Sequence, residues 1–192
     1  MYQEQQIRAV YDHHTITVYQ AYNKQIADLA VKHQKFVSPP FKMERMTWIK
    51  PSFLWMMYRS GWATKPDQEH VLSIKITRAG FDWALQNACL SHFDPLVHAS
   101  EDAWKTQLEN APVRIQWDPE RDIHMNKLDY RAIQIGLSAI AVQQYVDVWM
   151  VEVEDITDKV HRINQYLQNQ EIVLAQSLLP IENIYLPAGV SG

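Results

Sequence analysis

The stretch RMTWIKPSFLWMMYRSGWATK, residues 45–65, contains three tryptophans, one tyrosine and four cations in little more than twenty residues. Pro51 suits the first turn of a helix and Gly61 is a typical C-terminal stop, so the residues between them predict a short helix over Phe53 to Tyr58. This helix is apolar nearly all round, so we expect it to be central, with the other elements packed around it. At about ten residues it is too short to span a bilayer.

The tryptophans of this stretch have two interpretations. Trp48, Trp55 and Trp62 are spaced by seven residues, but Pro51 interrupts any helix that would unite them, so they need not share one face. In the first interpretation they are core residues, with solvated charges at the ends of the stretch. In the second they form the wall of a pocket, because aromatic faces beside guanidinium groups suit a planar ring that carries phosphates.

The pocket interpretation gives individual residues a role in nucleotide binding. Trp48 or Trp55 would stack on the base. Lys50, just before Pro51, lies at the start of the helix, where free backbone N–H groups and the helix dipole attract anions, and Ser52 adds a hydroxyl there. The alternative for Lys50 is an exposed lysine that happens to precede a proline. Three cations of the stretch are the candidate phosphate ligands: Arg45, Lys50 and Arg59.

Periodicity on either side of this stretch predicts alternating strands and helices. Asn23 is a plausible N-cap, and residues 118–119, Asp-Pro, predict a turn. We expect strands over 15–22, 71–77, 113–117, 131–137 and 148–153, and helices over 23–33, 80–90, 100–110 and 155–168. The fold class is therefore α+β, with small mixed or antiparallel sheets and packed helices in a single domain over residues 1–192, and a loose tail from about residue 186.

Composition excludes several classes of protein. The chain has 192 residues and a net charge of −4, which argues against a nucleic-acid binder that relies on bulk charge. With 5 glycines it has neither GxGxxG nor GxxxxGK[ST], so no Rossmann or Walker phosphate loop is present. A single cysteine and the lack of a charged start followed by an apolar run predict a cytoplasmic protein with no membrane association. The histidine spacing predicts no metal site.

Polar residues within two predicted strands are further candidates. Gln134, like Gln116, lies in an apolar strand, so its amide must bind a polar neighbour or face a cleft. Asp118 and the charged residues after it are interpreted as a solvated turn. Glu152 and Glu154 alternate with valines, which places both carboxylates on one strand face. Such a pair usually lies on the solvent-exposed face of an edge strand, although two carboxylates can also act as general acid and general base.

The motif RMTWIKPSFLWMMYRSGW resembles a bacterial family known only as a domain of unknown function. The resemblance extends to TITVYQAY upstream and to VRIQWDPERD and RAIQIGL downstream, and it covers about residues 7–163. So many tryptophan, methionine and lysine positions in one order make the motif specific. The family implies no reaction that could be transferred to individual residues.

A weaker resemblance, at the level of the fold, is to ADP-ribosyltransferases. It rests on a first strand with Tyr19, Gln20 and Tyr22, then a helix, then a motif with Thr47 and Ser52 that leads into another helix. These enzymes hold NAD in a cleft between two small sheets without a glycine loop. The resemblance therefore implies NAD as cofactor, with Tyr19 and Gln20 on the base-binding strand and Thr47 and Ser52 at the cofactor.

The same resemblance implies a catalytic glutamate on a late strand. The position that compares with it, in RAIQIGL, carries Gln134. Glu152 or Glu154 would then have to act on the ribose in place of that glutamate.

Three functional hypotheses follow. The first is a nucleotide-binding, NAD-dependent ADP-ribosyltransferase-like enzyme that transfers or hydrolyses the ADP-ribose part, with an RNA or protein acceptor left open. The second is a non-catalytic module that binds RNA or a nucleotide by stacking and local cations. The third is a protein-interaction domain in which the tryptophan-rich stretch is core.

Overall fold

Alternating apolar residues build the first of the two larger sheets. In the computed structural model, which describes residues 4–187, the order of this sheet is β2–β4–β8 and all pairs are antiparallel. The strands are β2 (Thr15–Tyr22), β4 (His70–Thr77) and β8 (Met150–Asp155). Since side chains alternate between the faces of a strand, Ile16, Val18 and Gln20 share one face, and the apolar members of that face enter the core.

The second sheet has the order β3–β7–β6–β5. It consists of β3 (Thr47–Ile49), β7 (Lys127–Leu137), β6 (Val113–Arg121) and β5 (Ala88–Leu90). Only the β5–β6 pair is parallel among these strands. Ile49, Ile133 and Ile135 belong to the same buried cluster as Val18 and Ile74 of the first sheet, so the principal core lies between the two sheets.

The two sheets meet at one backbone bridge. The amide of Tyr19 in β2 donates to the carbonyl of Lys50 at 2.7 Å, and the amide of Lys50 donates to the carbonyl of Tyr19 at 3.3 Å. Beyond this bridge β2 and β3 belong to different sheets, and Gln20 and Tyr22 contact Thr47 through side-chain hydrogen bonds and not through a backbone ladder.

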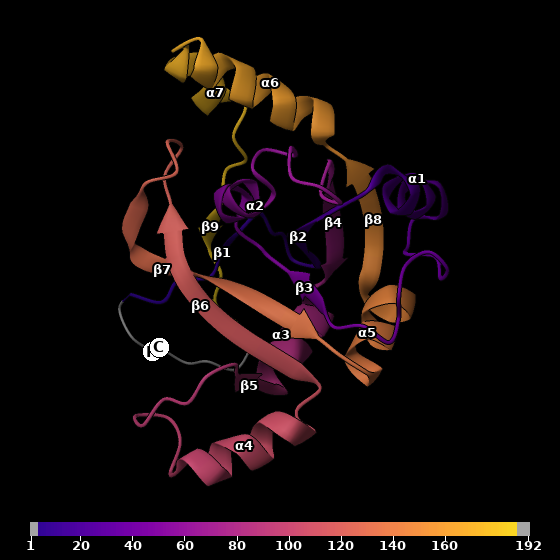
Figure 1. Cartoon of the computed structure of the whole chain (residues 1–192), viewed down its shortest axis with the longest axis vertical. Helices are drawn as coiled ribbons and strands as arrows, with labels where there is room; N and C mark the ends of the chain where they lie inside the picture. The colour runs from indigo at the N-terminus through magenta and orange to yellow at the C-terminus, as the bar shows by residue number, and fades with distance from the viewer. Residues whose placement is uncertain (1–3, 188–192) are drawn as a thin grey trace.

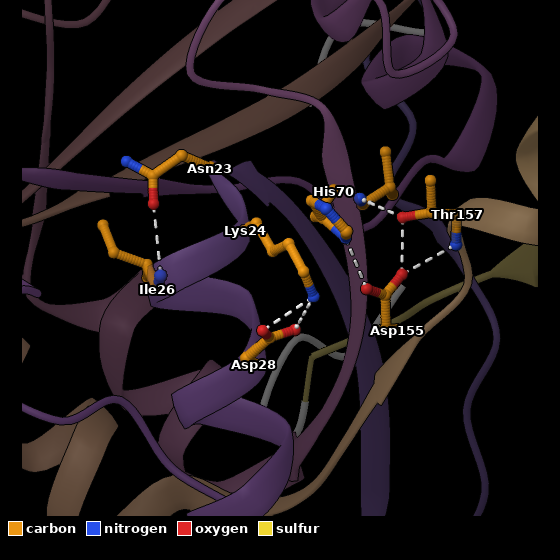
Figure 2. A network of polar contacts seen from close by, with 8 residues as sticks. Asn23, Lys24, Ile26, Asp28, His70, Asp155 and Thr157 are labelled. Carbon is orange, nitrogen blue, oxygen red and sulfur yellow. Dashed lines mark hydrogen bonds and ion pairs between the residues drawn. The ribbon is translucent and has the colours of Figure 1, made fainter.

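Local capping signals define the two helices next to this junction. The Asn23 side chain accepts a hydrogen bond from the amide of Ile26 and begins α1 (Lys24–His33) (Figure 2). Ser52 caps α2 (Phe53–Ser60) in the same way, and Gly61, with a φ of +60°, ends it in the left-handed conformation. Pro51 precedes the cap, so it lies before the first turn in which the sequence pattern placed it.

The remaining helices cover the sheets and their ends. Figure 1 shows α6 and α7 at one end of the long axis and α4 at the opposite end. The elements are α3 (Arg78–Gln86), α4 (Glu101–Asn110), α5 (Ile140–Gln144), the π-helix η1 (Tyr145–Trp149), α6 (Thr157–Gln168) and α7 (Ile172–Ser177). Two short strands near the chain ends, β1 (Arg8–Ala9) and β9 (Asn183–Ile184), pair antiparallel.

Three predicted boundaries are wrong for identifiable reasons. Asp118 and Pro119 do not turn the chain but continue β6, because a register shift between Pro119 and Arg121 accommodates the proline. The strand predicted over 148–153 begins two residues later than predicted, at Met150, since η1 extends to Trp149. The helix predicted over 80–90 begins at Arg78 and ends at Gln86, and the last three residues of that range form β5.

The fold is thus a single α+β domain, as the sequence predicts. Leu186 and Pro187 lie outside any helix or strand, and residues 188–192 of the predicted tail lie outside the described part of the chain. Within residues 4–187, no helix combines the length and the apolar character needed to cross a bilayer.

Candidate functional site

A cavity of about 600 Å³ lies beside the junction of the two sheets. Its walls come from the end of β2, the start of α1, the segment that includes β3, one face of α2, and residues 66–68. The lining residues are Gln20, Ala21, Tyr22, Asn23, Ile26, Pro40, Phe41, Lys42, Arg45, Met46, Thr47, Trp48, Lys50, Met56, Arg59, Pro66, Asp67 and Gln68.

The cavity brings together most of the residues that the sequence predicts as cofactor ligands. Six of them line it: Gln20, Arg45, Thr47, Trp48, Lys50 and Arg59. They come from β2, the segment before β3, β3 itself and α2, so they are separated by up to about forty residues in sequence. Tyr19, Ser52 and Trp55 are not among the lining residues.

The charge of the cavity is strongly positive. Lys42, Arg45, Lys50 and Arg59 line it, against one carboxylate, Asp67, among the lining residues. Within residues 4–187, none of these four cations has a carboxylate oxygen within ion-pair distance. Cations that gather without carboxylate partners leave their hydrogen-bond donors available to an anion.

Lys50 is the buried cation of the group. The residue is 6% exposed, and its Nζ donates to the carbonyl oxygen of Trp48 at 3.1 Å. Burial and the nearby Arg59 guanidinium lower the pKa of Lys50 to about 7, against the opposing effect of Asp118. The amine is therefore divided between its charged and neutral forms at neutral pH.

A row of polar side chains continues from Lys50 across the second sheet. Extending the β3–β7 register by one residue places Lys50 opposite Gln134, which pairs with Gln116 of β6. Asp118 accepts from the amide of Gln134 at 2.6 Å and from that of Gln116 at 3.0 Å. The sequence identified the two glutamines as needing a partner, but its interpretation of Asp118 as part of a solvated turn was wrong.

Behind the cavity, Gln20 and Thr47 belong to a buried hydrogen-bond network. The Gln20 amide donates to the Thr47 hydroxyl at 2.6 Å and to the Tyr22 hydroxyl at 2.9 Å. The Tyr145 hydroxyl of η1 donates to Gln20 Oε1 at 2.7 Å. Both ends of the Gln20 amide are thus bonded, which fixes its orientation at the cavity wall. Nothing in the local sequence identifies Tyr145 as its partner.

The other three predicted ligands have structural contacts. Tyr19 points to the opposite face of β2 from Gln20, where its ring meets Phe53 edge-on at 5.6 Å. The Ser52 hydroxyl caps α2 by accepting from the amide of Trp55 at 3.2 Å. Trp55 is buried and stacks on Tyr58 at 5.2 Å. The core interpretation therefore describes Trp55, whereas Trp48 is half-buried and lines the cavity.

The start of α2 already has a hydrogen-bond acceptor from the chain itself. The Glu182 carboxylate, from the segment just before β9, accepts from the amide of Phe53 at 2.7 Å. Lys50 instead directs its amine toward Trp48 and the cavity. The structure therefore separates two features that the sequence pattern combined into one anion site, Lys50 and the helix N-terminus.

The predicted catalytic carboxylates lie away from the cavity. The register places Glu154 beside Ser73 and Tyr19, so both Glu152 and Glu154 lie on the face of the first sheet opposite to Gln20. Both are exposed, and Glu152 pairs with Lys75 at 2.8 Å. Gln134, the third predicted catalytic residue, lies opposite Lys50 in the extended β3–β7 register.

A histidine that the sequence did not single out lies near the same end of the first sheet. His70 is directly opposite Tyr22 in the β2–β4 register, and its Nδ1 is 2.7 Å from an Asp155 carboxylate oxygen. Figure 2 shows that Asp155 also accepts from the Thr157 hydroxyl. These hydrogen bonds lower the pKa of Asp155, although burial opposes them. His70 does not itself line the cavity.

Fold and site together define the class: an α+β protein with a cationic, partly aromatic cavity at the junction of two small sheets. The chain belongs to the family described as domain of unknown function DUF4291, which matches residues 6–185. This confirms the predicted membership of a domain-of-unknown-function family. Comparison with curated proteins gives no significant match. Among the described residues, no three histidine, cysteine or carboxylate side chains group as metal ligands.

Proposed function

We propose that the cavity binds a nucleotide of the NAD or ADP-ribose type. The observation that carries this proposal is the convergence of Arg45, Lys50 and Arg59 on one cavity in which Asp67 is the single carboxylate among the described lining residues. Arginine is always charged and forms paired hydrogen bonds to phosphate oxygens, so Arg45 and Arg59 suit the two phosphates of a dinucleotide or of ADP-ribose.

The apolar part of the lining suits the ring of such a ligand. Trp48 is half-buried at the wall, and Tyr22, Phe41 and Met56 also line the cavity. Rings with an apolar face gain from contact with aromatic and thioether side chains. A volume of about 600 Å³ is within the usual range for small-molecule sites, roughly 300–1,000 Å³. The residues present therefore fit both the phosphates and a base.

The place of the cavity agrees with the resemblance to ADP-ribosyltransferases, which hold NAD between two small sheets. Here the cavity lies where β2 and β3 separate into different sheets. The transfer reaction has less support, since Glu152 and Glu154 lie on the opposite face of the first sheet. We therefore confine the proposal to binding, and ADP-ribose transfer stays a prediction from the resemblance.

The test measures the binding of NAD, ADP-ribose, ATP, GTP and a short RNA by thermal shift and calorimetry. Arg45→Ala and Arg59→Ala are each expected to weaken the bound nucleotide about tenfold or more, because a charged hydrogen bond is worth about 1.5–3 kcal/mol. Arg162→Ala, at an exposed position on α6, is the matched control and is expected to leave the affinity unchanged.

Two outcomes would contradict the proposal. The first is the absence of binding by every nucleotide at millimolar concentration in a protein whose melting curve shows that it is folded. The second is binding of the RNA alone with a steep loss of affinity as salt is added, which is typical of contacts to many phosphates and would favour an RNA-binding module.

A further inference from the structure

Lys50 combines three features that a simple phosphate ligand does not need. Its side chain is almost fully buried yet lines the cavity, and its one hydrogen bond among the described residues is donated to the Trp48 carbonyl. No carboxylate of residues 4–187 lies within ion-pair distance of its amine. The exposed Arg45 and Arg59 line the same cavity, so anion binding there has other donors.

The groups around Lys50 favour a neutral amine. The Arg59 guanidinium on α2 and burial both lower its pKa, to about 7. Asp118 on β6 acts in the opposite direction, but the amides of Gln134 and Gln116 each bind one of its oxygens. These two hydrogen bonds hold Asp118 in the polar row of the sheet and satisfy its charge without an ion pair to Lys50.

A buried lysine beside a second cation is the usual setting for covalent chemistry with carbonyl compounds. We propose that Lys50 forms a Schiff base with the carbonyl carbon of a phosphorylated aldose, such as the ring-opened terminal ribose of ADP-ribose or ribose 5-phosphate. Because it uses the same cavity and the same phosphate ligands, Arg45 and Arg59, this inference rests on the proposed function. It adds a reacting residue and a substrate class to that function.

The step is balanced without a further reactant. The lone pair of Lys50 Nζ attacks the aldehyde carbon and forms a C–N bond, while a proton passes from nitrogen to the carbonyl oxygen to give a carbinolamine. The carbinolamine then loses its hydroxyl group and a proton from nitrogen as water, and the C=N bond forms. An aldehyde and an amine thus give an imine and water, with no change in oxidation state.

The test traps the imine in the whole protein. The chain is incubated at about pH 7 with ribose 5-phosphate or ADP-ribose in the presence of cyanoborohydride, which reduces an imine to a stable amine. Peptide mapping by mass spectrometry then locates the adduct. We expect labelling of Lys50 at least about tenfold above that of Lys105, an exposed lysine of α4, because an exposed amine is almost fully protonated at this pH.

Two variants test whether the reaction requires the amine of Lys50 or only its positive charge. Lys50→Arg keeps the cation but cannot form an imine, so the Lys50 adduct is lost while ADP binding is retained. Lys105→Arg is the matched control, and its labelling at Lys50 is expected to equal that of the wild type. Since mapping of the wild-type protein already locates the adduct, the inference stays testable if Lys50→Arg does not fold.

Binding of ADP, which has no free aldehyde, distinguishes the two proposals. If ADP binds and labelling is spread evenly over exposed lysines or is absent, the Schiff base is wrong and nucleotide binding stands. If neither ADP nor ADP-ribose binds and Lys50 is not labelled, both are wrong. Preferential labelling of Lys50 that excess ADP suppresses is the result that supports the inference.

Discussion

Burial of the Lys50 amine lowers the stability of the fold. A buried cation loses its hydration, and here no carboxylate of residues 4–187 forms an ion pair with it in return. Residues whose surroundings shift their pKa in this way often serve function at the expense of stability. The remaining cations of the cavity, which lie exposed at the same wall, carry no such cost.

Replacement of Lys50 by an apolar side chain of similar length tests this cost. Lys50→Met is expected to stabilise the protein by about 1–2 kcal/mol at neutral pH and to weaken nucleotide binding. The unfolded chain binds a proton at Lys50 up to a pKa of about 10.5 and the folded chain only up to about 7, so wild-type stability rises between these pH values. The gain from Lys50→Met should therefore shrink as the pH is raised.

Urea unfolding at about pH 6.5 and about pH 9.5 measures this difference. Lys105→Met, at an exposed position on α4, is the control, and it is expected to change stability by no more than about 0.5 kcal/mol at either pH. A Lys50→Met variant that is less stable than the wild type at both pH values would show that burial of the amine is not a cost.

Among the elements, β3 contributes Thr47 and Trp48 to the wall of the cavity, and β7 approaches Trp48 closely. A Cβ built at Gly136 of β7 would lie 2.9 Å from Cζ2 of Trp48 and 3.0 Å from Sδ of Met46. The indole of Trp48 and the thioether of Met46 therefore both lie against the glycine, and both residues line the cavity. The position of Trp48 depends on the absence of a side chain on the neighbouring strand.

Gly136→Ala is expected to displace Trp48 from the wall. Overpacking of this kind costs about 1–3 kcal/mol of stability, and nucleotide affinity should fall with the loss of the stacking face. Calorimetry with the nucleotide and thermal unfolding measure the two effects. Gly80→Ala is the comparison, because its added Cβ would meet Trp149, which does not line the cavity. It should lose stability but keep its affinity while folded, and unchanged affinity in Gly136→Ala would contradict the role of Trp48.

The elements also show what the sequence could predict. The capped helices α1 and α2 and the eight-residue strands β2 and β4 have their signals within the element, in Asn23, Ser52 and the alternating apolar residues, and they were predicted correctly. The strand β3 has three residues, which are too few to show an alternation of apolar and polar side chains. Asp118 was misinterpreted because an Asp-Pro pair is a turn signal, which here is overridden by strand pairing and a bulge.

For the candidate site, composition predicted the residues but not the geometry. The unusual density of cations and tryptophans in residues 45–65 identified four lining residues, Arg45, Trp48, Lys50 and Arg59. The groups around them come from distant segments. Asp118 of β6 lies near Lys50, and the group that accepts from the start of α2 is Glu182, which is 129 residues after Phe53. Contacts at such separations leave no periodic pattern in the sequence, so only the folded chain shows them.

At the scale of the whole molecule, the two ends of the described chain pair with each other, and one of them contacts the central helix α2. The strand β1 pairs with β9, and the amide of Tyr185 donates to the carbonyl of Ile7 at 2.7 Å. The segment that leads into β9 carries Glu182, whose carboxylate accepts from the start of α2. The carboxyl group of Glu182 thus joins the start of α2 to the C-terminal strand β9, which in turn pairs with the N-terminal strand β1.

The state of Glu182 should make the stability of the whole domain depend on pH. Burial and the nearby Glu120 raise the pKa of Glu182 to about 8, while the hydrogen bond from Phe53 opposes the shift. Between a pKa near 4.5 in the unfolded chain and about 8 in the folded chain, the folded state binds the extra proton. The contribution of Glu182 to stability is therefore largest in acid and is lost as the pH rises through about 8.

Glu182→Gln keeps the oxygen that accepts from Phe53 and removes the titration. We expect this variant to melt close to the wild type at about pH 5 and a few degrees above it at about pH 9, because only the wild type must then bury a charged carboxylate. Comparison of the two proteins at each pH cancels the opposite contribution of Lys50, which both retain. Glu109→Gln, exposed on α4, is the matched control. A difference in melting temperature between Glu182→Gln and wild type that stays constant over this range would show that Glu182 does not take up a proton on folding.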